Sequence, residues 1–128
     1  MIEKNLSDFL PDKNSTYLKI NKNFIYSGKI IKDDIIKCIK TVVDPEIPVN
    51  LYDLGLIYKI NISNSNNIKI EMTLTNPNCP VAGTMPESVG KSLEKLNNYN
   101  SIEVSLVWEP KWHKNLMSEE AKLALDIF

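Results

Sequence analysis

The chain has 128 residues, of which 43% are hydrophobic and 24% are charged, and its formal net charge is −1. This length and balance suit one globular domain with a real core, and the near-zero charge excludes partners held by bulk electrostatics, such as nucleic acid or an anionic membrane surface. No apolar run approaches the roughly 20 residues of a membrane span. The two cysteines lie far apart and no secretory leader is recognisable, so we expect reduced thiols and a cytoplasmic protein.

The first part of the chain, residues 1–28, reads as an N-terminal extension, and residues 29–128 read as the main domain. Within the extension, Tyr17–Ile20 and Phe24–Tyr26 are apolar runs on either side of Asn21–Asn23. Two short apolar runs around an Asn-rich turn predict a small β-hairpin.

The main domain begins with a predicted helix over residues 33–43, where apolar residues recur at helical spacing and two acidic residues occupy the first turn. A turn-rich link over residues 46–55 follows. Strict alternation then predicts strands over 56–63 and 68–75, joined by the polar turn 64–67.

The second half of the main domain alternates helix and strand again. Apolar residues at steps of four and three predict a helix from Pro80 to about Asn97, and alternation predicts a strand over 102–108. Ser118, followed by two glutamates, is typical of the start of a last short helix. The sequence therefore predicts an α+β fold, in the order helix-strand-strand-helix-strand-helix, with the helices packed on a small mixed sheet.

Cys79 is the residue best placed for chemistry. It follows the strand that ends at Thr75 and directly precedes Pro80, which suits the first turn of the next helix. A thiol at a helix N-terminus faces unpaired N–H groups and the positive end of the helix dipole, which favour the thiolate. Spacing alone leaves two interpretations open, a nucleophile or metal ligand and a thiol packed beneath the loop.

The other candidates have simpler structural interpretations. Cys38 lies on the apolar face of its helix, where a cysteine acts as a small hydrophobe. His113, the only histidine, lies in a loop and reads as an exposed polar residue. Turn formation explains Asp44 and Asp53, whereas Glu46 between two prolines has no such local role. No two ligands have the spacing of a closed zinc site.

Three blocks of the sequence resemble a family of iron–sulfur assembly factors. Asp44–Tyr58 resembles the signature D-P-E-x-P-x-N-[IL]-x-D-L-G-L-[IV]-Y, residues 73–80 resemble the second block, and residues 106–121 resemble the third. The family includes the accessory factor SufT, PaaD of phenylacetate degradation and a cytosolic targeting factor of eukaryotes. Length and the N-terminal extension make the chain most similar to SufT-like members.

The resemblance implies an accessory protein in iron–sulfur protein maturation that is not an enzyme. It implies that Cys79 is the functional thiol or a transient cluster ligand, with Thr75 and Pro80 in the loop around it. It also implies an acidic motif of Asp44, Glu46 and Asp53 and a third motif containing Trp108 and Trp112. The expected partners are iron–sulfur scaffold or carrier proteins and recipient apoproteins.

One cysteine is too few for a stable cluster, which usually takes four protein ligands. The cluster would therefore be bound transiently, with no permanent cofactor, or two copies would each supply Cys79 across a homodimer. A small sheet with an exposed edge strand is compatible with such a dimer.

Two other functions stay open from the residues alone. In the first, the protein is a thiol enzyme in which His113 activates Cys79. In the second, it is a pure interaction adaptor whose docking face is the link between Asp44 and Tyr58, with no metal or thiol chemistry.

Overall fold

The computed structural model describes residues 15–44, 47–75 and 84–125. In chain order, the elements of this part are β1 (Ser15–Ile20), α2 (Lys32–Ile39), β2 (Ile57–Ile62), β3 (Asn67–Met72), α3 (Met85–Leu93), the 3₁₀ turn η1 (Glu94–Leu96), β4 (Ser101–Leu106), the 3₁₀ turn η2 (Lys114–Leu116) and α4 (Glu119–Ala124). None of the helices described is long and apolar enough to cross a membrane.

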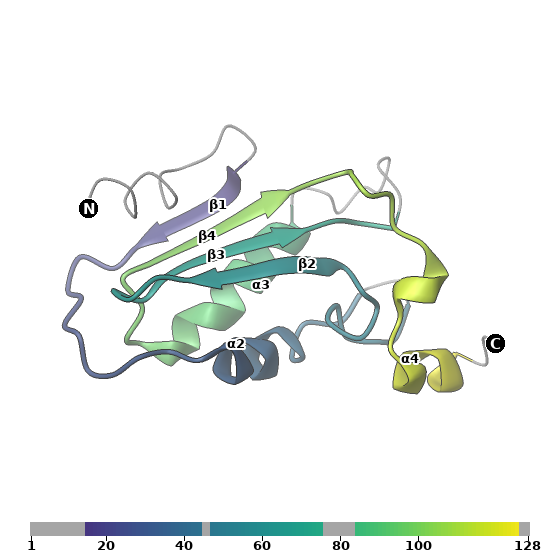
Figure 1. Ribbon diagram of the computed structural model, residues 1–128, viewed down its shortest axis with the longest axis horizontal. Helices are drawn as coiled ribbons and strands as arrows, with labels where there is room; N and C mark the ends of the chain where they lie inside the picture. The colour runs from purple at the N-terminus through teal and green to yellow at the C-terminus, as the bar shows by residue number, and fades with distance from the viewer. Residues whose placement is uncertain (1–14, 45–46, 76–83, 126–128) are drawn as a thin grey trace.

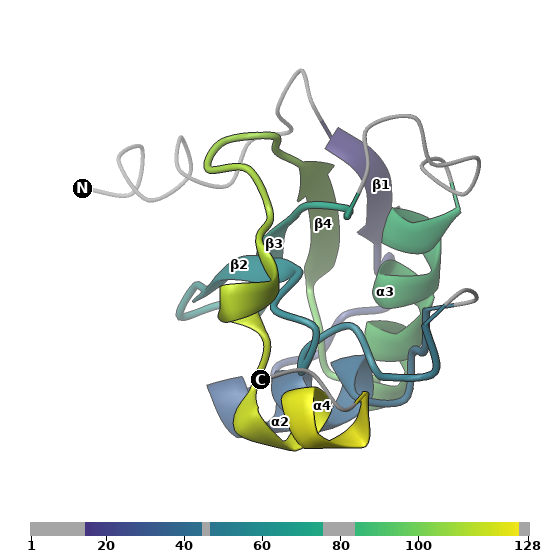
Figure 2. The same cartoon turned by 90° about the vertical axis from the view of Figure 1, so that its right-hand side faces the viewer.

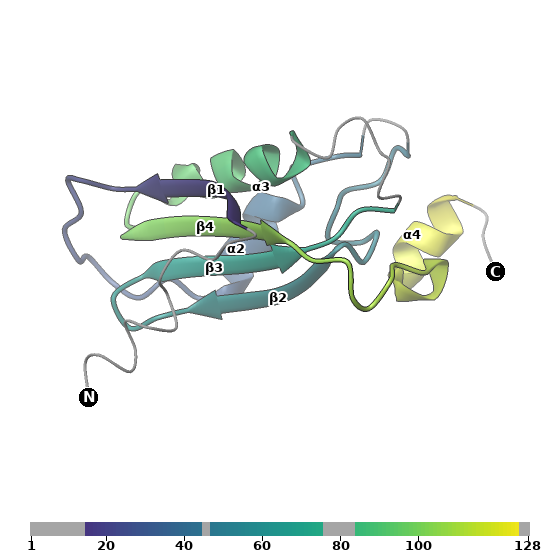
Figure 3. The same ribbon diagram turned by 90° about the horizontal axis from the view of Figure 1, so that it is seen from above.

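The four strands form one mixed sheet in the order β1-β4-β3-β2 (Figure 1). β2 and β3 form an antiparallel pair, β3 and β4 are parallel, and β1 is antiparallel to β4. α3 makes the crossover between the two parallel strands, as parallel pairing requires. Viewed from above, α2 and α3 lie behind the sheet on one face, and α4 lies beyond its end (Figure 3). The predicted α+β fold with a small mixed sheet is confirmed.

The core lies between the sheet and these two helices. The alternation of the two central strands is confirmed, because Ile70 and Met72 of β3 and Val104 of β4 are fully buried. α2 contributes Ile35 and Ile39 to the same core. Each such side chain contributes roughly 1.5–3 kcal/mol when it is removed from water, so the helix-covered face provides most of the stability.

The predicted N-terminal hairpin is wrong. β1 pairs with β4 instead, with Tyr17 opposite Val104, and residues 24–26 form no strand. An isolated two-stranded hairpin is marginally stable, whereas the free edge of β4 offers a long row of backbone donors and acceptors. The strand Ser15–Ile20 therefore belongs to the sheet. Because residues 1–14 lie outside the described part, the domain boundary at residue 28 stays a prediction.

Tyr17 fixes this edge strand to α3. A Cβ atom at Gly90 would lie 2.1 Å from a ring carbon of Tyr17, so only glycine lets the ring lie against the helix. The Tyr17 hydroxyl donates a hydrogen bond to the Glu94 carboxylate. Burial and this carboxylate raise the pKa of the hydroxyl above its ordinary value of 10.0.

Some boundaries differ from the predicted ones. α2 ends at Ile39, and Val43, which we expected in this helix, forms an isolated bridge with Asn50. α3 begins at Met85, with Thr84 as its N-cap residue, rather than at Pro80. The last helix starts as predicted, because the Ser118 hydroxyl accepts a hydrogen bond of 3.1 Å from the N–H of Ala121.

Candidate functional site

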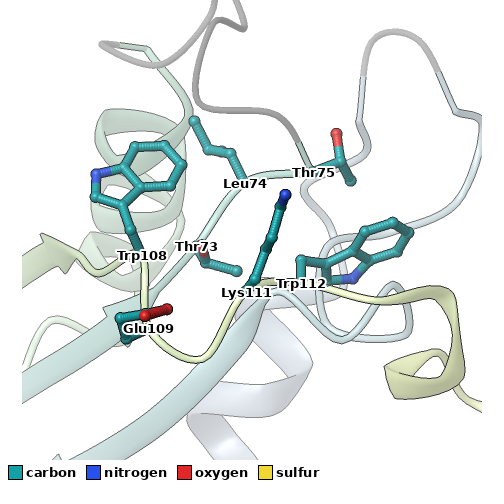
Figure 4. A pocket seen from close by; sticks show the side chains of 7 residues that line it. All are labelled: Thr73, Leu74, Thr75, Trp108, Glu109, Lys111 and Trp112. Carbon is teal, nitrogen blue, oxygen red and sulfur yellow. The ribbon is translucent and has the colours of Figure 1, made fainter.

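A pocket of about 210 Å³ lies where the two parallel strands end. Parallel strands bring their carboxyl ends to the same edge of a sheet, so the segments that follow β3 and β4 meet there. The N–H of Val107 donates to the carbonyl of Met72 over 2.8 Å and holds the two segments together. The lining comes from both segments (Figure 4): Thr73, Leu74 and Thr75 after β3, and Trp108, Glu109, Lys111 and Trp112 after β4.

The two tryptophans lie on opposite sides of this pocket (Figure 4). Trp112 is half-buried, and its indole N–H donates to the carbonyl of Leu54 over 2.7 Å, which fixes the ring. Trp108 is 41% exposed. Lys111 extends between the two rings, and its side chain is exposed. The pocket therefore combines a fixed aromatic wall, an exposed aromatic wall and a cation.

Thr73 introduces an unusual polar atom into the pocket. This residue is 1% exposed, and its hydroxyl oxygen is buried with no hydrogen-bond partner among the described residues. A buried polar atom without a partner costs free energy, about 1–3 kcal/mol in proteins. Native structures contain few such atoms, so the one at this pocket calls for an explanation.

The segment after β4 is held on the conserved-looking turn of the first sequence block by a set of backbone contacts. The Tyr58 hydroxyl donates to the carbonyl of Pro110 over 2.8 Å, and the N–H of Ser118 donates to the carbonyl of Asp53 over 2.8 Å. Together with the Trp112–Leu54 bond, these contacts join the first and third sequence blocks into one unit (Figure 2).

Gly55 makes this close approach possible. Its φ of +80° lies in the left-handed region, and a Cβ atom there would lie 2.4 Å from the carbonyl oxygen of Leu116. A side chain at this position would push the third block away from the turn. The glycine of the signature thus has a structural reason that depends on a residue more than sixty positions away.

The acidic motif forms the turn, as we expected for two of its members. Asp44 accepts a hydrogen bond of 3.0 Å from the N–H of Ile47. Asp53 accepts one of 2.7 Å from the Asn50 side-chain amide, while its own N–H donates to the Asn50 side chain over 2.9 Å. Neither carboxylate belongs to the described lining of the pocket. Glu46 lies outside the described residues.

Cys79 and Pro80 also lie outside the described residues. Of the predicted site residues, the structure brings together Thr75, Trp108 and Trp112. Thr75 is the last residue described before Cys79 in the chain. Because α3 begins at Met85, the expected effect of the dipole of this helix on Cys79 has lost its basis.

The two alternative candidates behave as the sequence predicted. Cys38 is half-buried against the core, and burial raises the pKa of its thiol. His113 is exposed, and its Nδ1 accepts a hydrogen bond of 3.1 Å from the N–H of Asn115. Within the part of the chain that the structure describes, no three side chains of His, Cys, Asp or Glu are grouped to hold a metal ion.

Sequence reasoning did not identify Thr73, Glu109 and Lys111 as site residues. Lys111 had a visible signal, because it is enclosed by two tryptophans within five residues. Thr73 had none, since a threonine at an outward strand position is ordinary.

Comparison with known proteins gives consistent results. The sequence model of a family described as iron–sulfur cluster assembly protein matches residues 32–106. A Porphyromonas gingivalis protein named Fe-S protein maturation auxiliary factor is 45% identical over 94 residues, which are 73% of this chain and 90% of that protein. The Staphylococcus aureus Fe-S protein maturation auxiliary factor SufT is 36% identical over 86 residues, 67% of this chain and 98% of that protein.

The fold also has a solved counterpart. A crystal structure of a domain of unknown function from Bacillus anthracis is similar with a TM-score of 0.71 and 39% sequence identity. The similarity covers 76% of this chain and 92% of that one. The part without a counterpart is thus about a quarter of the chain.

Proposed function

Because this chain belongs to the iron–sulfur cluster assembly protein family, we propose that it is an accessory factor that assists the maturation of iron–sulfur proteins and is not an enzyme. The support is the family match over residues 32–106 and the names of two similar proteins, both maturation auxiliary factors. A SufT-like member of this family is expected to act on other proteins, namely scaffolds or carriers that donate clusters and apoproteins that receive them.

In this proposal, Cys79 is the functional thiol. A thiolate is the usual protein ligand of iron–sulfur clusters, and a stable cluster takes about four of them. One thiolate per chain therefore suits a cluster that is cargo and passes between partners. The donor, the recipient or a second copy of this chain would supply the remaining ligands.

The pocket supports this role through its position in the chain. Cys79 follows Thr75 of the pocket lining by four residues, and four residues of chain reach at most about 14 Å. A partner bound at the pocket would therefore be within reach of the thiol. Docking and chemistry would then be separate tasks of neighbouring residues.

Anaerobic reconstitution of the full chain with iron and sulfide tests the thiol directly. The chain offers a matched control, because it contains only two cysteines. We expect the visible absorption of a bound cluster in the wild type and in Cys38→Ser, and its loss in Cys79→Ser. Loss in Cys38→Ser with retention in Cys79→Ser would overturn the assignment.

The cellular test measures a client protein. In a strain that depends on this chain, Cys79→Ser should lower the activity of an iron–sulfur enzyme without lowering the amount of its polypeptide, whereas Cys38→Ser should not. Undiminished activity of the client enzyme with Cys79→Ser would contradict the proposed role of the thiol.

A second function, a docking adaptor without thiol chemistry, has one observation in its favour. The turn that carries Asp44 and Asp53 is held rigidly by its own side chains and by the third block. Such a preformed surface suits protein recognition. In this case Glu46→Gln would abolish partner binding in a pull-down with a scaffold protein, and Cys79→Ser would change neither binding nor client activity.

A further inference from the structure

We propose that the pocket between Trp108 and Trp112 binds a single tyrosine side chain presented by a partner protein. This inference deepens the proposed function, on which it rests for the identity of the partner as a scaffold, carrier or client. The chemistry of the side chain comes from the pocket itself, namely from its size, its walls, its charge and one unsatisfied hydroxyl.

The size of the pocket favours a side chain over a cofactor. Sites for drug-sized ligands and cofactors have volumes of roughly 300–1,000 Å³. The pocket here, at about 210 Å³, lies below that range. It is large enough for one large side chain and too small for a folded segment or a nucleotide.

The walls favour an aromatic ring. Trp108 and Trp112 lie on opposite sides of the pocket, so an inserted ring would meet an indole on either side (Figure 4). Aromatic pairs prefer offset-stacked or edge-to-face arrangements, which two flanking indoles can provide. Lys111 extends between them, and an ammonium group is attracted to the face of an aromatic ring but not to an aliphatic chain.

The charge at the rim favours a neutral ligand. The lining contains one carboxylate, Glu109, and one ammonium group, Lys111. These two charges leave the rim without net charge, so a phosphate or carboxylate ligand would gain from one and be repelled by the other. The chain also contains no arginine, the residue best suited to bind such anions with two parallel hydrogen bonds. A neutral phenol encounters neither problem.

The buried hydroxyl of Thr73 distinguishes tyrosine from phenylalanine. Its oxygen lines the pocket region, is buried, and has no partner among the residues that the structure describes. A hydroxyl can donate one hydrogen bond and accept two, and a phenolic hydroxyl can act in either direction. An inserted tyrosine would therefore give Thr73 the partner that it lacks, whereas phenylalanine would leave it unsatisfied.

The binding test uses the full chain and its own fluorescence. The chain contains two tryptophans, and both line the pocket, so tryptophan emission excited at the red edge reports on this site. The probes are N-acetyl-tyrosinamide, N-acetyl-phenylalaninamide and N-acetyl-leucinamide. We expect saturable binding of the tyrosine probe with a dissociation constant on the order of a millimolar, the range for a ligand of this size.

The order of the probes tests the chemistry. The phenylalanine probe should bind about fivefold more weakly than the tyrosine probe, the effect of one net hydrogen bond. The leucine probe should bind more weakly than both. Equal affinity of the tyrosine and phenylalanine probes, or no saturable change with any probe, would overturn the proposal.

Variants of Thr73 test the assigned atom. Thr73→Val keeps the shape and removes the hydroxyl, so it should bind the two aromatic probes equally. Thr73→Ser keeps the hydroxyl and should retain the preference for tyrosine, which also serves if the valine variant does not fold. The matched control is Thr41→Val, an exposed threonine outside the pocket whose hydroxyl bonds to the carbonyl of Cys38. It should retain the preference, and a preference that persists in Thr73→Val would exclude the assignment.

The two proposals fail separately. Probe binding does not involve the thiol, so Cys79→Ser should bind the tyrosine probe as the wild type does. Absence of probe binding in a protein that still loses client maturation with Cys79→Ser would reject the pocket alone. Normal probe binding together with normal client maturation in Cys79→Ser would reject the thiol alone.

Discussion

The two ends of the sheet treat buried polar groups in opposite ways. At the end formed by the β2–β3 turn, Asn66 is fully buried and its side chain is fully used. Its amide donates to the carbonyls of Gly28 and Asn98, and its oxygen accepts from the N–H of Ile30, over 2.8–3.0 Å. At the other end, the hydroxyls of Thr73 and Ser105 are buried without a partner among the described residues.

This contrast separates a structural end from a functional end. A satisfied polar network stabilises the fold and specifies one arrangement of its loops. Buried groups that are left unsatisfied cost stability, and natural proteins retain them mainly where function needs them. The end of the sheet that carries Trp108 and Trp112 is the one that keeps this cost.

The largest expected effect is at the satisfied end. Asn66→Ala removes three side-chain hydrogen bonds and places alanine at a φ of 59°. Each buried group left unpaired costs about 1–3 kcal/mol and the left-handed backbone about 1–2 kcal/mol more, although relaxation recovers part of this. We expect the free energy of unfolding to fall by about 4 kcal/mol in a urea titration. The control is Asn64→Ala in the same turn, where an exposed side chain should change it by less than about 0.5 kcal/mol.

The second effect concerns the contact that closes the functional end. Gly55→Ala forces a Cβ atom against the carbonyl of Leu116 in addition to straining the backbone. Overpacking and a left-handed alanine together should cost about 3 kcal/mol. Gly28→Ala has a φ of +126° but no described atom within 4 Å of its Cβ, so it carries the backbone strain alone. Equal losses of unfolding free energy in the two variants would show that the third block is not held in place at Gly55.

The third effect compares the two walls of the pocket. Trp112→Phe deprives the buried carbonyl of Leu54 of its indole donor and should lower the free energy of unfolding by about 2 kcal/mol. Trp108→Phe changes an exposed ring and should lower it by less than about 0.5 kcal/mol. Thermal unfolding followed by circular dichroism checks both variants. A larger loss with Trp108→Phe would contradict the division into a fixed and an exposed wall.

The smallest effect has opposite signs at the two ends. Thr73→Val removes an unpartnered buried hydroxyl and should raise the free energy of unfolding by about 1 kcal/mol. Ser101→Ala removes a hydroxyl that donates to the Asn67 side chain over 2.7 Å and should lower it by about 1 kcal/mol. Chemical denaturation of both variants measures the difference. If Thr73→Val is destabilised as Ser101→Ala is, the two ends do not differ in this way.

Much of the fold was predictable because it rests on local patterns. The alternation in β3 and β4 and the cap at Ser118 identify their elements without any knowledge of neighbours. The start of α3 was not predictable, because an apolar stripe continues past the residues that form the helix. The partner of β1 was not predictable either, since a hairpin and a place at the sheet edge need the same alternating residues.

The candidate site divides in the same way. The sequence by itself determined the α+β fold, the family motifs and the turn-forming roles of Asp44 and Asp53, since these depend on residue type and short spacing. Only the tertiary structure decided that Thr73 lies with Trp108, Trp112 and Lys111 and that its hydroxyl has no described partner. The physical reason is that parallel pairing brings together strand ends that are more than thirty residues apart, and no local pattern records which side chains meet there.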